Sequence, residues 1–132
     1  MTRLPLLLAL LCVALLAGCG SDDERDPAET VRAFVKATTE RDAKTFCGEL
    51  VTQEFLEQTT GATGDDAQPA CERELEAVRG LDLELVRIEK TTVDGDSATV
   101  RALLVTEGRR DERTFQLKRE DDQWKLAGGG EG

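Results

Sequence analysis

The side chains best suited to covalent chemistry in this chain are its four cysteines, Cys12, Cys19, Cys47 and Cys71. A deprotonated thiol is a nucleophile and a metal ligand, and two thiols in an oxidising compartment form a disulfide. The segment around each cysteine therefore decides which of these reactions is open to it.

The segment that precedes Cys19 has the order of a secretory signal. Arg3 is its only charged residue, and an uncharged, leucine-rich run extends from Leu4 to Ala17. The small pair Ala17-Gly18 leads directly into the cysteine, so the usual small-x-small cleavage site is missing. The alternatives are an uncleaved transmembrane helix, for which the uncharged span Leu4–Ser21 is barely long enough, and an ordinary signal peptide.

The sequence Leu16-Ala17-Gly18-Cys19 resembles the lipobox of bacterial lipoproteins. In that family the cysteine thiol receives a diacylglyceryl group, the signal is cut just before it, and the new N-terminus is usually acylated. The resemblance implies a signal peptide over residues 1–18, a lipidated flexible tether over residues 19–26 and an anchor at Cys19. Several acyl chains on one residue, palmitate among them, would hold the protein stably on the extracytoplasmic face of the cell membrane.

Export leaves Cys47 and Cys71 as a pair, because Cys12 would leave with the signal and Cys19 would carry lipid. In an oxidising compartment a disulfide is the default for such a pair. Closing a loop of about 25 residues would stabilise the fold by about 3–4 kcal/mol in the chain-entropy model. Two isolated thiols in a chain without histidine cannot complete a tetrahedral zinc site, so we expect no metal and no other cofactor.

Size and charge limit the partners. Without its first 18 residues the 132-residue chain keeps 114, enough for one domain with a modest core. The formal charge of the whole chain is −10, and it becomes −11 when Arg3 is removed with the signal. This balance argues against nucleic acid as a partner and against electrostatic docking on anionic headgroups.

Helix signals dominate the first half of the mature chain. Asp26 followed by Pro27 and Glu29 resembles a capping box, so a helix should begin at Pro27. The helical spacing then predicts one buried stripe formed by Val31, Phe34, Val35 and Thr38.

Three shorter helices should follow. Asp42 is expected to cap a helix that ends at Gly48, and Thr52 to cap another turn or two. After a polar loop, Pro69 should open a helix that runs to about Arg79.

From Leu81 the apolar residues recur with a period of two, which predicts strands, and a slip in phase indicates a bulge near Leu85. Asp94-Gly95 is a strong signal for a hairpin turn. The later strands are expected over Asp96–Thr106, Arg113–Lys118 and Gln123–Ala127, with the first of these central in the sheet.

Helices followed by about four antiparallel strands predict an α+β fold, with the helices packed on one face of a curved sheet. The first helix with Phe34 and Val35, the step Arg41–Ala43 and the closing hairpin around Trp124 resemble the nuclear-transport-factor-two-like superfamily, also called cystatin-like or SnoaL-type. The resemblance implies a cone-shaped domain over residues 27–128 and a disordered tail over residues 129–132. The lipobox and the cysteine pair further resemble small exported lipoproteins of actinobacteria.

Enzymes of that superfamily place acid–base residues, commonly Asp, His or Tyr, inside the cone. This chain has no histidine and no tyrosine, so only Asp, Glu, Lys or Arg could serve. Asp42 is the candidate aspartate, although helix capping explains it equally well. Glu89 and Arg101 should face solvent on strands. Asp94–Ser97 superficially resembles a calcium loop but lacks its later ligands, so a hairpin turn is the better interpretation.

We therefore expect no catalytic residues, and a noncatalytic lipoprotein domain that binds an envelope protein or a small apolar ligand. An isomerase- or hydrolase-like enzyme with a carboxylate base and a structural envelope component are the alternatives. If the cone is unfilled, four apolar residues are candidates for its walls: Phe34, Phe55, Leu104 and Trp124.

Overall fold

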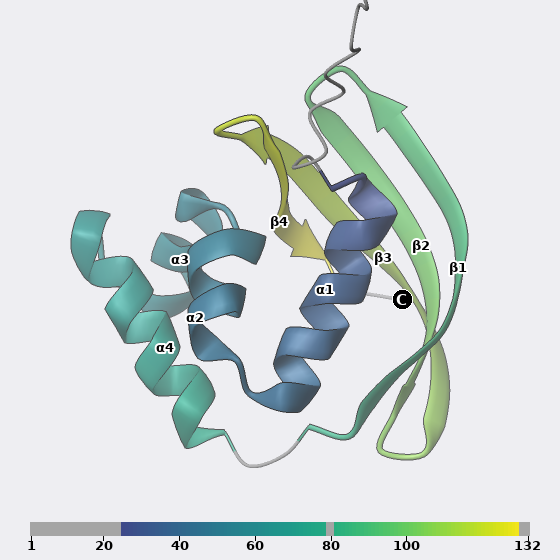
Figure 1. Cartoon of the computed structure of the whole chain (residues 1–132), viewed down its shortest axis with the longest axis horizontal. Coiled ribbons are helices and arrows are strands. Elements are labelled where there is room, and N and C mark those ends of the chain that lie inside the picture. The colour runs from purple at the N-terminus through teal and green to yellow at the C-terminus, as the bar shows by residue number, and fades with distance from the viewer. Residues whose placement is uncertain (1–24, 79–80, 130–132) are drawn as a thin grey trace, which may run out of the picture.

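The computed structural model describes residues 25–78 and 81–129 (Figure 1). The expected signal peptide, Cys19 and most of the expected tether lie outside these residues. Within the described ranges, no helix has the length and apolar character needed to span a bilayer.

Four α-helices precede a four-stranded antiparallel sheet whose strand order follows the sequence, β1-β2-β3-β4. Helix α1 lies across the concave face of the curved sheet, and α4 lies farthest from it (Figure 1). The predicted fold class is thus confirmed. The helical elements are α1 (Pro27–Glu40), α2 (Ala43–Thr45), the π-helix η1 (Phe46–Leu50), α3 (Gln53–Thr60), the 3-10 helix η2 (Gly64–Asp66) and α4 (Ala67–Ala77). The strands are β1 (Leu83–Asp94), β2 (Ser97–Thr106), β3 (Arg109–Glu120) and β4 (Gln123–Gly129).

Helix α1 begins as its sequence predicts. The Asp26 carboxylate accepts a hydrogen bond from the Glu29 backbone N–H at 2.8 Å, and Pro27 occupies the first turn. The hydroxyl of Thr30, which is fully buried, donates to the backbone carbonyl of Trp124 at 3.1 Å. This bond ties the first turn of α1 to the start of β4.

Two predicted helix boundaries were wrong. The helix that Asp42 caps continues through η1 to Leu50. Gly48 lies inside it, at a position where an added Cβ atom would come 3.0 Å from the Gln68 side-chain nitrogen. Gly48 therefore permits close packing against α4 and does not end the helix. Helix α4 starts at Ala67 and ends at Ala77, and Pro69 is accommodated in its first turn, where no backbone donor is needed.

The sheet extends further than the alternation of apolar residues predicted. Strand β3 begins at Arg109, four residues early, because its polar residues pair fully with β2. Strand β4 includes Gly129, which was assigned to the tail, and a Cβ atom there would lie 2.5 Å from the Thr114 carbonyl oxygen. The bulge near Leu85 is confirmed, and β1 has a second irregularity between Ile88 and Lys90.

The core lies between α1 and the concave face of the sheet and continues under the shorter helices. Inward side chains of β2 alternate with outward ones, as expected for strand geometry. The most completely buried large side chains are Leu50, Leu104, Leu117, Val31, Val51, Val100, Thr30 and Cys47.

Candidate functional site

A cavity of about 320 Å³ opens between α1 and the concave face of the sheet, at the end where β1 begins and β2 ends. This volume is at the lower end of the range for small-molecule sites. Apolar side chains form most of its wall, and two threonines and one arginine add polar groups. The lining residues are Phe34, Thr38, Leu81, Leu83, Leu104, Thr106, Arg113, Phe115 and Gly129.

The inner part of this cavity is buried and its rim is exposed. Leu104 and Phe115 are 1% and 5% exposed, and the Phe115 ring meets that of Phe34 edge-on with centroids 5.7 Å apart. Leu81, at the rim, is 45% exposed. Exposed apolar side chains at the rim of an apolar cavity suit entry of an apolar molecule.

The four residues named as cavity walls from the sequence separate into two groups. Phe34 and Leu104 line the cavity. Phe55 packs on the core from α3. The Arg119 guanidinium carbon lies over the ring of the buried Trp124, 4.9 Å from the ring centroid. Neither of these two is among the lining residues.

Of the lining residues that the sequence reasoning did not name, Arg113 is the one that carries a charge. It is half-buried on β3, two positions before the inward-facing Phe115. Side chains two apart on a strand share a face, so the spacing Arg113, Phe115, Leu117 was the signal that could have placed it inside. Of the cavity-lining residues in the described chain, Arg113 alone is ionisable.

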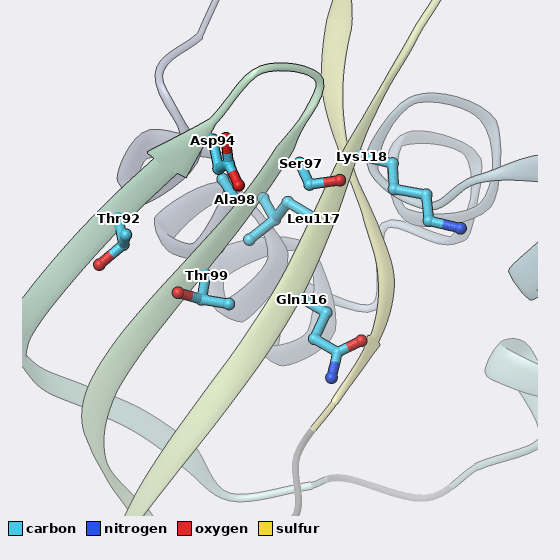
Figure 2. A pocket seen from close by; sticks show the side chains of 8 residues that line it. All are labelled: Thr92, Asp94, Ser97, Ala98, Thr99, Gln116, Leu117 and Lys118. Atoms are coloured by element: carbon cyan, nitrogen blue, oxygen red, sulfur yellow. The ribbon is translucent and has the colours of Figure 1, made fainter.

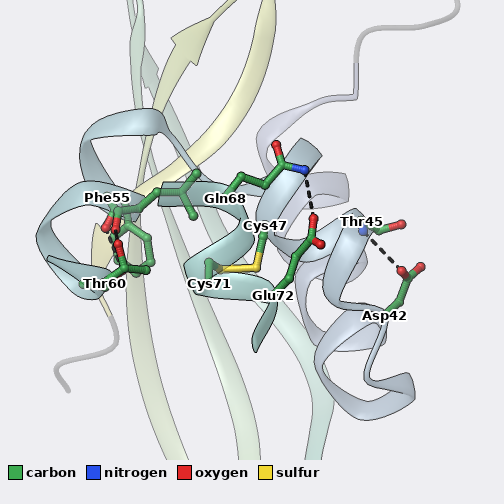
Figure 3. Close-up of a disulfide and its surroundings, with 10 residues drawn as sticks. Asp42, Thr45, Cys47, Phe55, Thr60, Gln68, Cys71 and Glu72 are labelled. Atoms are coloured by element: carbon green, nitrogen blue, oxygen red, sulfur yellow. Dashed lines mark hydrogen bonds between the residues drawn. A yellow bond between two sulfur atoms is a disulfide. The ribbon is translucent and has the colours of Figure 1, made fainter. Parts of the chain in front are cut away.

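Cys47 and Cys71 form a disulfide between η1 and α4, with sulfur atoms 2.04 Å apart (Figure 3). Both residues are buried. Beside them on α4, the Gln68 amide donates to Glu72 at 2.9 Å. Within residues 25–78 and 81–129, no group of three or more His, Cys, Asp or Glu side chains could hold a metal ion.

The carboxylates singled out from the sequence lie away from the cavity. Asp42 caps α2, and hydrogen bonds from Thr45 lower the pKa of its carboxyl group. Asp94 and Ser97 flank the two-residue β1–β2 turn, as predicted for a hairpin.

Glu89 and Arg101 lie on the outer face of the sheet. Their side chains form an ion pair at 3.6 Å, and Glu89 also accepts a hydrogen bond from Arg87 at 3.0 Å. Hydrogen bonding to Glu112 and Arg87, together with the charges of Arg87 and Arg101, lowers the pKa of Glu89. This cluster is a surface ion-pair network with no opening to the cavity.

A second hollow lies on the outer face near the β1–β2 turn (Figure 2). Its volume is about 270 Å³, and most of the residues around it, which come from β1, β2 and β3, are polar. Its cation, Lys118, is 57% exposed and pairs with Glu54 at 3.7 Å. The residues around it are Thr92, Asp94, Ser97, Ala98, Thr99, Gln116, Leu117 and Lys118. The more apolar cavity under α1 is the better enclosed site.

No protein-family profile matches the chain, and no curated protein matches it. Among solved structures, a candidate aromatic ring hydroxylase from Novosphingobium aromaticivorans is similar over 77% of this chain and 82% of its own, with 16% identity and a TM-score of 0.54. This similarity shows a shared fold, and at that identity it carries no information about activity.

Two further solved structures align with lower scores. A candidate ketosteroid isomerase from Kribbella flavida has 20% identity and a TM-score of 0.46, covering 79% of this chain and 77% of its own. An NTF-2-like protein of unknown function from Shewanella oneidensis has 14% identity and a TM-score of 0.46, covering 77% and 92%.

Proposed function

We propose that this chain is a lipid-anchored extracytoplasmic domain that binds a small apolar molecule in the cavity under α1. The observation that carries the binding part is the composition of the cavity wall, which is largely apolar and has Arg113 as its ionisable side chain. Arginine stays protonated at all physiological pH values, so it cannot act as a general base. A wall without a carboxylate supports binding over acid–base catalysis.

The disulfide supports the extracytoplasmic part of the proposal. Disulfides persist in exported proteins and are rare in reducing compartments. Together with the lipobox-like sequence before Cys19, the buried bond between Cys47 and Cys71 favours a mature protein that acts outside the cytoplasm.

The binding proposal is tested by filling the cavity. Thr106 is half-buried at the end of β2 and lines the cavity, so a phenylalanine there would occupy the space of one ligand ring. We expect Thr106→Phe to weaken binding of the neutral probe N-phenyl-1-naphthylamine by about tenfold or more, since the lost apolar contact exceeds 1.4 kcal/mol. The measurement is a fluorescence titration of the mature protein.

Thr99→Phe is the matched control, because Thr99 lies on the opposite face of the same strand and borders the outer hollow. It should leave the probe affinity unchanged. If the wild-type protein does not bind the probe, or if Thr99→Phe weakens it more than Thr106→Phe, the cavity under α1 is not the binding site.

The anchoring proposal predicts a complete change of location for one substitution. Cys19→Ala removes the thiol that would carry the acyl chains, each of whose methylenes contributes about 0.8 kcal/mol to membrane binding. We expect the variant to lose acyl labelling and to leave the membrane fraction entirely, with the Cys47–Cys71 disulfide intact. A variant that stays in the membrane fraction would contradict the anchor.

A further inference from the structure

We infer that the cavity takes a small apolar anion from the aqueous phase, and not a lipid from the bilayer to which the chain is tethered. This inference rests on the proposed function and deepens it, because it gives the charge of the ligand and the side from which the ligand enters. Two independent features carry it: the position of Arg113 and the placement of the cavity relative to the start of α1.

Arg113 gives the apolar cavity a positive site. Its guanidinium carries five N–H donors in a planar fork that matches a carboxylate or sulfonate. The apolar walls made by Phe34, Leu104 and Phe115 lower the local dielectric, which strengthens attraction for an anion that comes close.

The start of α1 and the rim of the cavity lie at opposite ends of the domain. We call the end with the first turn of α1, the β1–β2 turn and the β3–β4 turn the attachment end (Figure 1). There the Thr30 hydroxyl bonds the Trp124 carbonyl, and the Arg119 N–H donates to the Asp96 carbonyl at 2.9 Å. The rim, with Leu81 and Thr106, lies where β1 begins and β2 ends, near the C-terminal end of α1.

The chain between Cys19 and α1 is short compared with this separation. Seven residues, 20–26, can span at most about 25 Å when fully extended, and about 15 Å on average as a coil. Helix α1, with 14 residues, is itself about 21 Å long. Turning the rim onto the bilayer would require the linking chain to run almost fully extended along the whole domain. The average geometry therefore directs the rim away from the membrane.

The charge of the ligand is tested with two probes that share one apolar ring system, 2-naphthoate and 2-naphthylmethanol, titrated into the mature protein. Arg113→Gln should lower the affinity for 2-naphthoate by about ten- to a hundredfold, the usual effect of losing a hydrogen bond to a charged group. It should leave the affinity for the alcohol almost unchanged. Arg110→Gln removes the same charge from the outer face of β3 and is the matched control. Equal affinity of the two probes in the wild-type protein would overturn the anion preference.

The direction of entry is tested with the lipidated protein on vesicles of phosphatidylcholine and phosphatidylglycerol. A fluorophore is attached at Asp96→Cys, at the attachment end, or at Arg109→Cys, beside the rim, and a headgroup-linked quencher is added. We expect stronger quenching at position 96. Stronger quenching at position 109 would overturn the inference and indicate a lipid ligand, while failure of both naphthyl probes to bind would overturn the proposed function itself.

Discussion

Replacing Cys47 and Cys71 together with alanine should lower the free energy of unfolding by about 3 kcal/mol. The reason lies in α4, which has only two buried residues, Ala67 and Cys71. Helix α4 packs on the other helices and lies farthest from the sheet (Figure 1), so the disulfide is its strongest attachment to the core. Urea unfolding followed by circular dichroism measures the loss.

The wild-type protein treated with a reducing agent is the control for this experiment. It should lose a similar amount of stability, because reduction removes the crosslink without removing any side-chain atoms. The double variant should also exchange the amide protons of α4 faster than those of α1. A change below about 1 kcal/mol, which is the average for any substitution, would show that packing alone holds α4.

Trp124→Ala should cost about 3–5 kcal/mol of unfolding free energy, as do other truncations of a buried tryptophan. Trp124 is 4% exposed and belongs to the core cluster, and its backbone carbonyl accepts a hydrogen bond from the Thr30 hydroxyl. Because it does not line the cavity, the affinity of the folded fraction for N-phenyl-1-naphthylamine should stay within about twofold, a difference well below 1.4 kcal/mol. Urea unfolding and probe titration on the same sample give both values.

Phe34→Ala provides the opposite pattern and is the comparison for Trp124→Ala. Phe34 lines the cavity and is half-buried. Its truncation should therefore lower the affinity for the probe more than Trp124→Ala does, and lower the free energy of unfolding less. If Trp124→Ala lowered the affinity for the probe as much as Phe34→Ala does, the cavity would have to extend to the attachment end.

Local signals predicted the elements of the fold well. Asp26, Asp42 and Thr52 each cap the helix expected, because a cap depends on a side chain and a backbone N–H only three residues apart. The boundary error at Gly48 has a different origin. It depends on what packs against the helix, and that partner, Gln68, is distant in the sequence.

The site was predicted less completely than the fold, for the same physical reason. Apolar residues such as Phe34 and Trp124 look alike in a sequence, and only the curvature of the sheet decides which of them meets empty space. Arg113 was missed because its strand was predicted from apolar alternation, whereas the early part of β3 is polar on both faces. Its shared face with Phe115 was readable from the spacing, but the cavity beside it was not.

If the proposed lipid anchor holds the protein on a membrane, the two irregularities in β1 keep neighbouring copies apart. Strand β1 is an edge of the sheet, and its twelve residues have no paired strand on one side among the residues that the structure describes. Copies confined to a membrane meet far more often than copies in solution, and straight, flat edges would join neighbouring molecules strand to strand into fibres. The bulges after Leu85 and Ile88 bend this edge, and the charged Arg87 and Lys90 flank them, so crowded copies would remain separate.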